Sequence, residues 1–292
     1  MFPDVMAAAR GDTDAPAGSR WIETPEGRMR YLEAGRGPPV LLVHGATMTA
    51  DDPAAALFDT LAVDHHVIAL DRPGHGWSDR RRGAQSTVQA QGRALLQAAA
   101  ALEMDRAVLV GHSYGGAVVV AMALQRPDAV AGVVALGPVV LPEFRLEHML
   151  FTTRTTPGWG DAFMETASRP FDRGLLTLLW EAQFKPQNVP ARFRETFPYE
   201  RAKIPAQIMA TGEDAGSLFA SLTEMDAGIS RLAVPVRVLA GTADLVVNPM
   251  HGQALARRAP DGQIEMLPGL GHMIHWFAQD KVRERVVELS GA

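Results

Sequence analysis

A serine lies between two glycines at a point where the chain is predicted to turn from a strand into a helix. The short apolar run of residues 107–110 leads into Gly111-His-Ser113-Tyr-Gly115, and the Ala- and Val-rich stretch Ala117–Gln125 that follows has the composition of a helix. A serine that projects from such a sharp turn needs residues without side chains two positions before and after it. The pattern therefore predicts that Ser113 is a nucleophile.

A serine hydroxyl at neutral pH needs a base, and that base needs an acid to orient it. Candidates follow two later strand-like runs: Gly241-Thr-Ala-Asp244 comes after Val234–Ala240, and Pro268-Gly-Leu-Gly-His272 comes after Gln263–Leu267. Both lie on predicted loops at the carboxyl end of a strand, in the chain order serine, acid, histidine. We therefore predict that Ser113, Asp244 and His272 form a catalytic triad.

Other acids and histidines in the sequence are placed less well for this chemistry. Asp214 and Asp226 lie in a long interval without strand runs, and His275 already enters the last predicted helix. The remaining candidates are a helical histidine, His251, and two that precede a strand, His65 and His66. No H-E-x-x-H motif or clustered ligand spacing is present, so we expect neither a metal nor a cofactor.

A tetrahedral intermediate at the serine would need hydrogen-bond donors for its oxyanion. The backbone N–H of Tyr114, at the start of the following helix, is one predicted donor. The second is the N–H of Ala46, on the loop after the apolar run Pro39–Val43. The residues expected to shape the supporting loops are His44, Gly45, Gly111 and Gly115.

Eight strand-like runs and several helical stretches must position these groups. The strand candidates are Trp21–Thr24, Arg28–Glu33, Pro39–Val43, His66–Leu70, Ala107–Val110, Gly132–Leu136, Val234–Ala240 and Gln263–Leu267, the last less apolar and suited to an edge. The helix candidates are Val88–Leu102, Ala117–Gln125, Pro249–Arg258 and Asp280–Leu289. This alternation predicts an α/β fold with a mostly parallel, eight-stranded sheet flanked by helices.

One interval, residues 141–232, has no clear strand run and contains seven prolines among helix-compatible apolar residues. A structureless loop of that length is improbable in a compact domain, so we predict several short helices that form a cap. The core then comprises residues 20–140 and 233–292, and residues 1–19 are predicted to be a flexible tail. The alternative is a separate helical domain without a role in the site.

The cap aromatics suggest an apolar substrate pocket, although each of them could equally pack in the interior of the cap. These residues are Phe151, Trp159, Phe163, Trp180, Phe184, Phe193 and Phe197. Among them we expect Trp159 and Trp180 to contact the substrate, together with Tyr199 and the hydroxyl of Thr47.

Composition narrows the class of protein. The chain has 292 residues, of which 47% are hydrophobic and none is cysteine. Its formal net charge of −5 argues against nucleic acid as the main partner. Its one basic cluster, residues 80–82, is expected to be a solvated loop. Neither a signal peptide nor a membrane-spanning run is evident, so we expect no membrane association and a cytoplasmic location. The sequence does not predict the oligomeric state.

Five motifs resemble those of the α/β-hydrolase superfamily: His44-Gly45, Asp71–Ser78 (DRPGHGWS), Gly111–Gly115, Gly241–Asp244 and Gly271-His272. The second motif is similar to a loop in the capped branch that contains epoxide hydrolases, haloalkane dehalogenases, cofactor-free haloperoxidases and carbon–carbon bond hydrolases. That loop is mostly structural there, so the resemblance implies no catalytic role for its aspartate or histidine. The interval 141–232 is similar to the cap of that branch.

Departures from the branch separate its activities. Epoxide hydrolases and dehalogenases have aspartate at the nucleophile position, where this chain has Ser113, so neither activity is expected. Carbon–carbon bond hydrolases share the triad but usually have a longer glycine-rich oxyanion segment than Ala46–Thr49. The resemblance therefore implies hydrolysis of the carboxylic ester of a small, largely apolar substrate. The open alternatives are cleavage of a carbon–carbon bond in a ring-cleavage product, perhydrolase or haloperoxidase-like chemistry, and a non-enzymatic small-ligand sensor.

Overall fold

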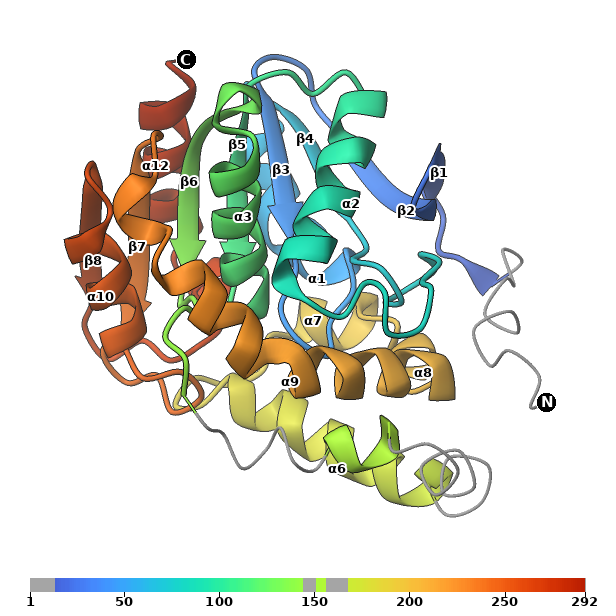
Figure 1. The fold of residues 1–292 in the computed structure, drawn as a ribbon. Coiled ribbons are helices and arrows are strands. Elements are labelled where there is room, and N and C mark those ends of the chain that lie inside the picture. Colours follow the sequence, from blue (N-terminus) through green and yellow to red (C-terminus); the bar gives the residue numbers. More distant parts are fainter. Residues whose placement is uncertain (1–13, 144–150, 156–167, 292) are drawn as a thin grey trace.

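The computed structural model describes residues 14–143, 151–155 and 168–291, which surround one eight-stranded sheet (Figure 1). In sheet order the strands are β1 (Arg20–Thr24), β2 (Gly27–Ala34), β4 (His66–Leu70), β3 (Pro39–Val43), β5 (Ala107–His112), β6 (Val130–Leu136), β7 (Val236–Gly241) and β8 (Gly262–Leu267). The pairings β1–β2 and β2–β4 are antiparallel, and all others are parallel. The predicted fold class is confirmed, and β8 is an edge strand as expected.

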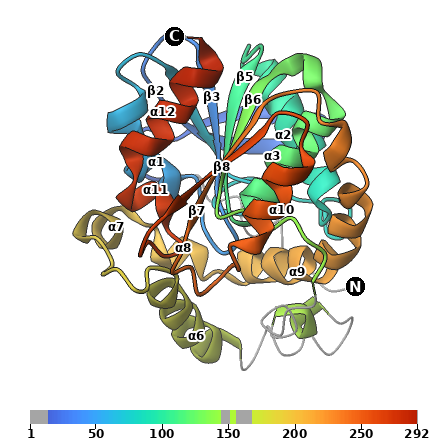
Figure 2. The same ribbon diagram turned by 90° about the vertical axis from the view of Figure 1, so that its left-hand side faces the viewer.

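The apolar runs form central strands because both of their faces are covered. Along β3, Val40 and Leu42 point into one hydrophobic cluster, whereas Leu41 and Val43 point into the other. One face packs against α2 (Val88–Ala101), α3 (Tyr114–Gln125) and α10 (Met250–Arg258). The opposite face packs against α1 (Asp51–Leu61), α11 (Ile274–Phe277) and α12 (Gln279–Ser290), as Figure 2 shows from the side. Helix α1 was not predicted from the sequence.

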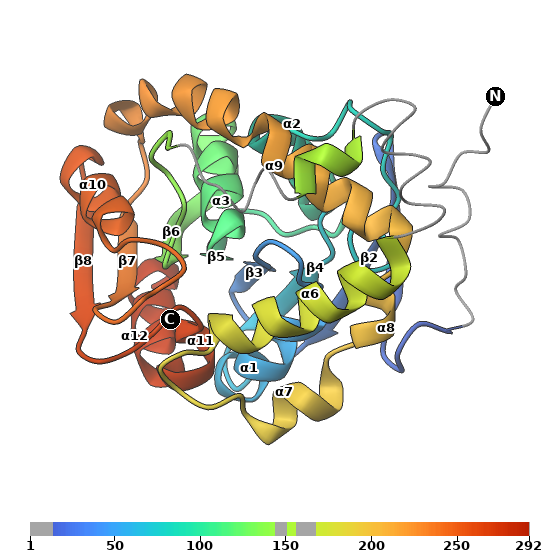
Figure 3. The same ribbon diagram turned by 90° about the horizontal axis from the view of Figure 1, so that it is seen from below.

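The described part of the interval between β6 and β7 is mainly helical and contains no strand. It contains α6 (Ser168–Gln183), α7 (Ala191–Thr196), α8 (Tyr199–Ala202) and α9 (Pro205–Asp226). Figure 3 shows α6 and α9 lying across the carboxyl ends of the parallel strands, so we keep the name cap for residues 141–232. Helix α9, with 22 residues, is longer than the short helices that were expected.

Two expectations about polar segments change in the structure. The basic cluster is a solvated loop only in part: Arg81 and Arg82 are exposed as expected, but Arg80 is buried and donates to Asp214 of α9 and to the Pro73 carbonyl. Of the predicted tail, residues 1–13 lie outside the described residues, and Asp14 accepts a hydrogen bond from the Trp77 indole. Within the described part of the chain, we find no helix long and apolar enough to cross a bilayer.

Candidate active site

Ser113 occupies the sharp turn between β5 and α3, with φ 55° and ψ −117°. This positive φ is rare for a residue with a side chain, and such strain is characteristic of functional turns. The turn needs its glycines: a Cβ on Gly111 would lie 2.4 Å from the Gly115 carbonyl oxygen, and one on Gly115 would lie 2.3 Å from the Val43 carbonyl oxygen. The sequence pattern therefore corresponds to a backbone that only glycine permits at these two positions.

Asp244 and His272 meet on the loops that follow β7 and β8. The Nδ1 atom of His272 lies 2.8 Å from Oδ2 of Asp244, and both side chains are buried. Burial opposes ionisation of Asp244, but the His272 ring and the backbone N–H groups of Val246 and Val247 outweigh it, so the Asp244 pKa lies below its ordinary value. An ionised carboxylate only accepts hydrogen bonds, so Nδ1 carries the hydrogen and Nε2 is left as a base.

The turn after β6 brings the serine and this pair to the same edge of the sheet. The Ser113 N–H donates to the Leu136 carbonyl, 2.9 Å away. A Cβ on the next residue, Gly137, would lie 3.3 Å from Asp244 Oδ2 and 3.4 Å from His272 Nδ1. The ring of His112, which precedes the serine, places Nε2 3.1 Å from the His272 carbonyl oxygen. The three predicted catalytic residues thus lie around one short turn.

The loop after β3 packs directly against the serine. A Cβ on Gly45 would lie only 3.3 Å from the Ser113 Cβ. Ala46 and Thr47 line the same cavity as Ser113 and Tyr114, which is where the two predicted oxyanion donors must be. Thr47 has a positive φ of 61°, so the chain turns sharply after Ala46.

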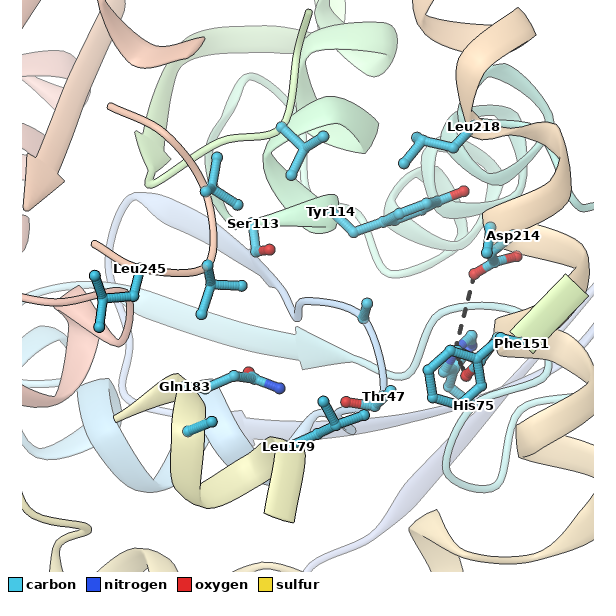
Figure 4. A pocket seen from close by; sticks show the side chains of 17 residues that line it. Thr47, His75, Ser113, Tyr114, Phe151, Leu179, Gln183, Asp214, Leu218 and Leu245 are labelled. Atoms are coloured by element: carbon cyan, nitrogen blue, oxygen red, sulfur yellow. Dashed lines mark hydrogen bonds and ion pairs between the residues drawn. The ribbon is translucent and has the colours of Figure 1, made fainter. Parts of the chain in front are cut away.

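A cavity of about 350 Å³ opens beside the serine, between the sheet edge and the cap. Figure 4 shows Ser113 between Leu245 on one side and Phe151 with His75 on the other. The lining residues are Ala46, Thr47, His75, Ser113, Tyr114, Val139, Phe151, Leu179, Ala182, Gln183, Thr211, Asp214, Ala215, Leu218, Leu245, Val246 and Val247. Most of these side chains are apolar, so the cavity suits a largely apolar ligand.

The residues predicted to contact the substrate separate in the structure. Thr47 lines the serine cavity, but Trp180 and Tyr199 line a different, smaller cavity of about 150 Å³. Their rings pack edge-to-face with each other and with Phe197, which leaves them in the interior of the cap. Trp180 reaches the site only indirectly, by donating its indole N–H to Thr47 Oγ1 at 3.2 Å. Trp159 and Phe163 lie outside the described residues.

The cap contributes several lining residues that sequence reasoning missed. Leu179 and Gln183 project from α6, and Thr211, Asp214 and Leu218 from α9. Their spacing, three or four residues apart, is that of one helix face, but the same spacing is found on any buried face. No signal in the sequence distinguishes a cavity wall from the packed interior.

One end of the cavity is polar and buried. Asp214 accepts hydrogen bonds from Arg72 at 2.8 Å and from Arg80 at 2.6 Å. Beside it, burial lowers the pKa of His75 well below its ordinary value, and the charges of Arg72 and Arg80 lower it further. His75 is therefore neutral, and this end of the cavity combines a neutral imidazole with a carboxylate bound by two guanidinium groups.

A second group of titratable residues lies behind the serine. Asp52, His112 and His275 are buried and offer ligand atoms within 4.8 Å of one another, which would suit a metal ion. Asp52 already accepts hydrogen bonds from His275 Nε2 at 3.0 Å and from the Trp276 indole at 2.8 Å. His275 Nε2 is thus occupied by Asp52, and the side chains nearest to the turn after β6 are those of Asp244 and His272. We therefore assign this cluster no part in the chemistry at Ser113.

Comparison with known proteins gives one family. Residues 38–279 match the family model described as the alpha/beta hydrolase fold. The chain is 28% identical over 287 residues to "Haloalkane dehalogenase 2" of Mycobacterium tuberculosis, covering 94% of this chain and 96% of that protein. Its fold is similar to that of an alpha/beta hydrolase fold protein from Burkholderia ambifaria (TM-score 0.78, 21% identity, 94% and 98% of the two chains). The fold is also similar to that of an esterase from Rhodococcus, with a TM-score of 0.72 and 24% identity over 94% of this chain and 99% of the esterase chain.

Proposed function

Because the chain belongs to the alpha/beta hydrolase fold family, we propose that it is a serine hydrolase that cleaves the carboxylic ester of a small, largely apolar molecule. The observation that carries this proposal is Ser113, held at φ 55° on the cavity wall beside the Asp244–His272 pair. A strained serine, a histidine whose Nε2 can accept a proton and an ionised acid are the parts that acyl transfer needs.

The proposed reaction has two halves. His272 removes the proton from the Ser113 hydroxyl as its oxygen attacks the ester carbonyl carbon. The N–H groups of Ala46 and Tyr114 stabilise the oxyanion, and His272 then protonates the departing alcohol. In the second half His272 removes a proton from a water molecule, which attacks the acyl-enzyme carbonyl. His272 then returns this proton to the Ser113 oxygen as the carboxylic acid departs. Asp244 holds the imidazole in the required tautomer throughout.

The shape of the cavity suggests how an ester would lie. The leaving alcohol must be near His272, and Leu245–Val247, which follow Asp244, form that end of the cavity. The acyl chain would then extend in the opposite direction, past Leu179 and Leu218 toward Phe151. An apolar acyl group fits that wall, because burial of each CH₂ group stabilises the complex by about 0.8 kcal/mol.

Dehalogenation is disfavoured despite the similarity to a haloalkane dehalogenase. Related dehalogenases attack carbon with an aspartate, and a neutral serine hydroxyl cannot replace a carboxylate in that displacement. Carbon–carbon bond hydrolysis, perhydrolysis and ligand sensing remain the alternatives, because all three are compatible with a serine triad. An experiment on ester hydrolysis therefore has to distinguish it from these three alternatives.

A panel of p-nitrophenyl esters from acetate to octanoate tests the proposal, with the wild type and Ser113→Ala. We expect turnover by the wild type and a loss of about 10⁴-fold or more in Ser113→Ala. Turnover of a vinylogous 1,5-diketone without turnover of any ester would favour carbon–carbon bond hydrolysis. Peroxide-dependent turnover would favour perhydrolysis, and no turnover of any substrate would favour a sensor.

A further inference from the structure

A buried guanidinium lies directly behind the oxyanion loop. Arg72 follows β4, is fully buried, and does not line the serine cavity. Each of its five N–H groups has an acceptor. These acceptors are the carbonyls of His44 (3.2 Å) and Gly45 (3.1 Å), His75 Nε2 (3.3 Å), Gln91 Oε1 (2.7 Å) and Asp214 Oδ2 (2.8 Å).

Two of these acceptors determine how the oxyanion loop is oriented. The Gly45 carbonyl and the Ala46 N–H belong to one peptide unit, and this peptide is trans. The C=O and N–H of a trans peptide point in opposite directions. Because Arg72 holds the carbonyl on its own side, the Ala46 N–H is directed away from Arg72 and toward the cavity. Loss of this contact would remove one of the restraints on rotation of the peptide.

His44 holds the same carbonyl from a second direction. Its Nε2 accepts the backbone N–H of Arg72 at 2.9 Å, so the hydrogen is on Nδ1, which donates to the Gly45 carbonyl at 2.8 Å. Burial lowers the His44 pKa well below its ordinary value, and the charge of Arg72 lowers it further, which is consistent with a neutral ring. A carbonyl that accepts two hydrogen bonds, one from a cation, also polarises its peptide and strengthens the N–H as a donor.

We propose that Arg72, with His44, is a positioning residue that orients and polarises the Gly45–Ala46 peptide as an oxyanion donor. This inference rests on the proposed function at Ser113. The opposite side of the guanidinium is bound to Asp214 of α9, so the cap helix anchors the group that shapes the oxyanion hole. Gln91 of α2 binds both Arg72 and Asp214 and completes the anchor.

Arg80 provides a matched control for Arg72. Its side chain is also fully buried and also bonded to Asp214, and its other partners are Glu213 and the Pro73 carbonyl. None of its hydrogen bonds or ion pairs in the described structure reaches the oxyanion loop, and it does not line the cavity. We call Arg72, Arg80, Glu213 and Asp214 the ionic cluster. A general weakening of this cluster should lower kcat in variants of both arginines, whereas a loss of oxyanion positioning should lower kcat only in Arg72 variants.

The test compares three variants: Arg72→Lys, Arg72→Gln and Arg80→Lys. For each variant, kcat and KM are measured with p-nitrophenyl acetate. The Ki of phenylboronic acid is also measured, because its serine adduct mimics the tetrahedral intermediate.

We expect kcat to fall about thirtyfold in Arg72→Gln and by less in Arg72→Lys, which keeps the charge. Both losses should be smaller than the loss of about 10²–10³-fold that follows removal of a whole oxyanion donor. KM should stay within about threefold, and boronate binding should weaken in parallel with kcat. Arg80→Lys should keep kcat and Ki within about threefold.

Thermal unfolding checks that each variant is folded. If the Arg72 variants do not fold, His44→Gln tests the same peptide from its other donor and should show the same loss of kcat and boronate affinity. Wild-type kcat and Ki in a folded Arg72→Gln or His44→Gln would overturn the inference, as would equal losses in Arg72→Gln and Arg80→Lys. A wild type without turnover or boronate binding would overturn the proposed function, and this inference with it.

Discussion

Two buried aspartate–histidine pairs flank the residue that precedes the proposed nucleophile. Asp244 and His272 are 2.8 Å apart, and Asp52 and His275 are 3.0 Å apart. The ring of His112 lies between them, with centroids 4.6 Å from His272 and 4.5 Å from His275. By distance and burial alone the two pairs are nearly equivalent, and their histidines are only three positions apart in the sequence.

The pairs differ in what surrounds them. Asp244 lies on a loop whose next three residues, 245–247, line the serine cavity. Asp52 lies on α1 and accepts the Trp276 indole N–H as well as His275, and none of its chain neighbours in 49–55 lines that cavity. A buried Asp–His contact is therefore weak evidence of a general base, because access to the reacting atoms decides the role. We propose that the first pair serves catalysis and the second holds α1 against α11.

Substitution of each histidine by glutamine should give the largest difference in kcat between the two pairs. His272→Gln removes the proposed general base, so kcat for p-nitrophenyl acetate should fall about 10⁴-fold or more. His275→Gln should keep kcat within about tenfold and lower the melting temperature. Steady-state kinetics with thermal unfolding measures both, and similar losses of kcat in the two variants would break the distinction between the pairs.

Substitution of each aspartate by asparagine should also lower kcat more in the first pair than in the second, but by a somewhat smaller factor than for the histidines. Asp244→Asn keeps the shape but permits the wrong imidazole tautomer, so kcat should fall about 10³–10⁴-fold. Asp52→Asn leaves one buried amide hydrogen-bonding group unmatched and should lower the free energy of unfolding by about 1–3 kcal/mol. Urea unfolding and ester kinetics on both variants separate these effects. Loss of activity in Asp52→Asn at unchanged stability would contradict the structural role of the second pair.

Acid should destabilise the fold through histidines that are buried and neutral. Burial lowers the pKa of His44, His75 and His112 well below 6.5, and neighbouring charged or titratable groups lower it further. Above pH 6.5 both states are deprotonated, and below it only the unfolded chain binds protons. Stability should therefore fall with pH below 6.5, by up to roughly 4 kcal/mol per pH unit for three such groups.

Urea unfolding measured at several pH values from 8 to 5 gives the free energy of unfolding at each pH, and hence this slope. His112→Asn, which replaces the ring between the two pairs, should reduce the limiting slope by about 1.4 kcal/mol per pH unit. An unchanged slope in that variant would mean that His112 is protonated in the folded state. Burial between the two pairs would then not keep this ring neutral.

The smallest expected effect concerns substrate choice. Leu179 lines the cavity beside the first pair, so Leu179→Ala should shift the octanoate-to-butyrate ratio of kcat/KM upward by roughly tenfold or less. Trp276→Phe, beside the second pair, should leave the ratio unchanged. A ratio that moves only in Trp276→Phe would place the acyl chain somewhere other than this cavity.

The sheet and the proposed triad could be predicted from sequence because short-range chemistry determines them. The runs at Pro39–Val43 and His66–Leu70 are strands with the predicted bounds, since both faces of a central strand must be apolar. The Gly111–Gly115 pattern corresponds to a turn that excludes any Cβ at either glycine. Helix α1 was missed because its first turn, Asp51-Asp-Pro53, resembles a loop, although proline is well tolerated there.

The cavity and the ionic cluster could not be predicted, because residues far apart in the chain create them. Arg80 is neutralised by Glu213 and Asp214, more than 130 residues later, so its own neighbours wrongly indicated a solvated loop. Tyr199 was expected at the substrate, but its ring packs among cap aromatics. Whether a cap side chain faces the cavity or the interior depends on how the helices dock, which helix periodicity does not encode.

The most direct test of the central claim is covalent labelling by a fluorophosphonate, with the modified peptide identified by mass spectrometry. We predict one adduct on Ser113 in the wild type, none in Ser113→Ala, and much slower labelling in His272→Gln than in His275→Gln. Labelling at another residue, or no labelling of a folded wild type at any concentration tested, would contradict the claim that Ser113 is an activated nucleophile.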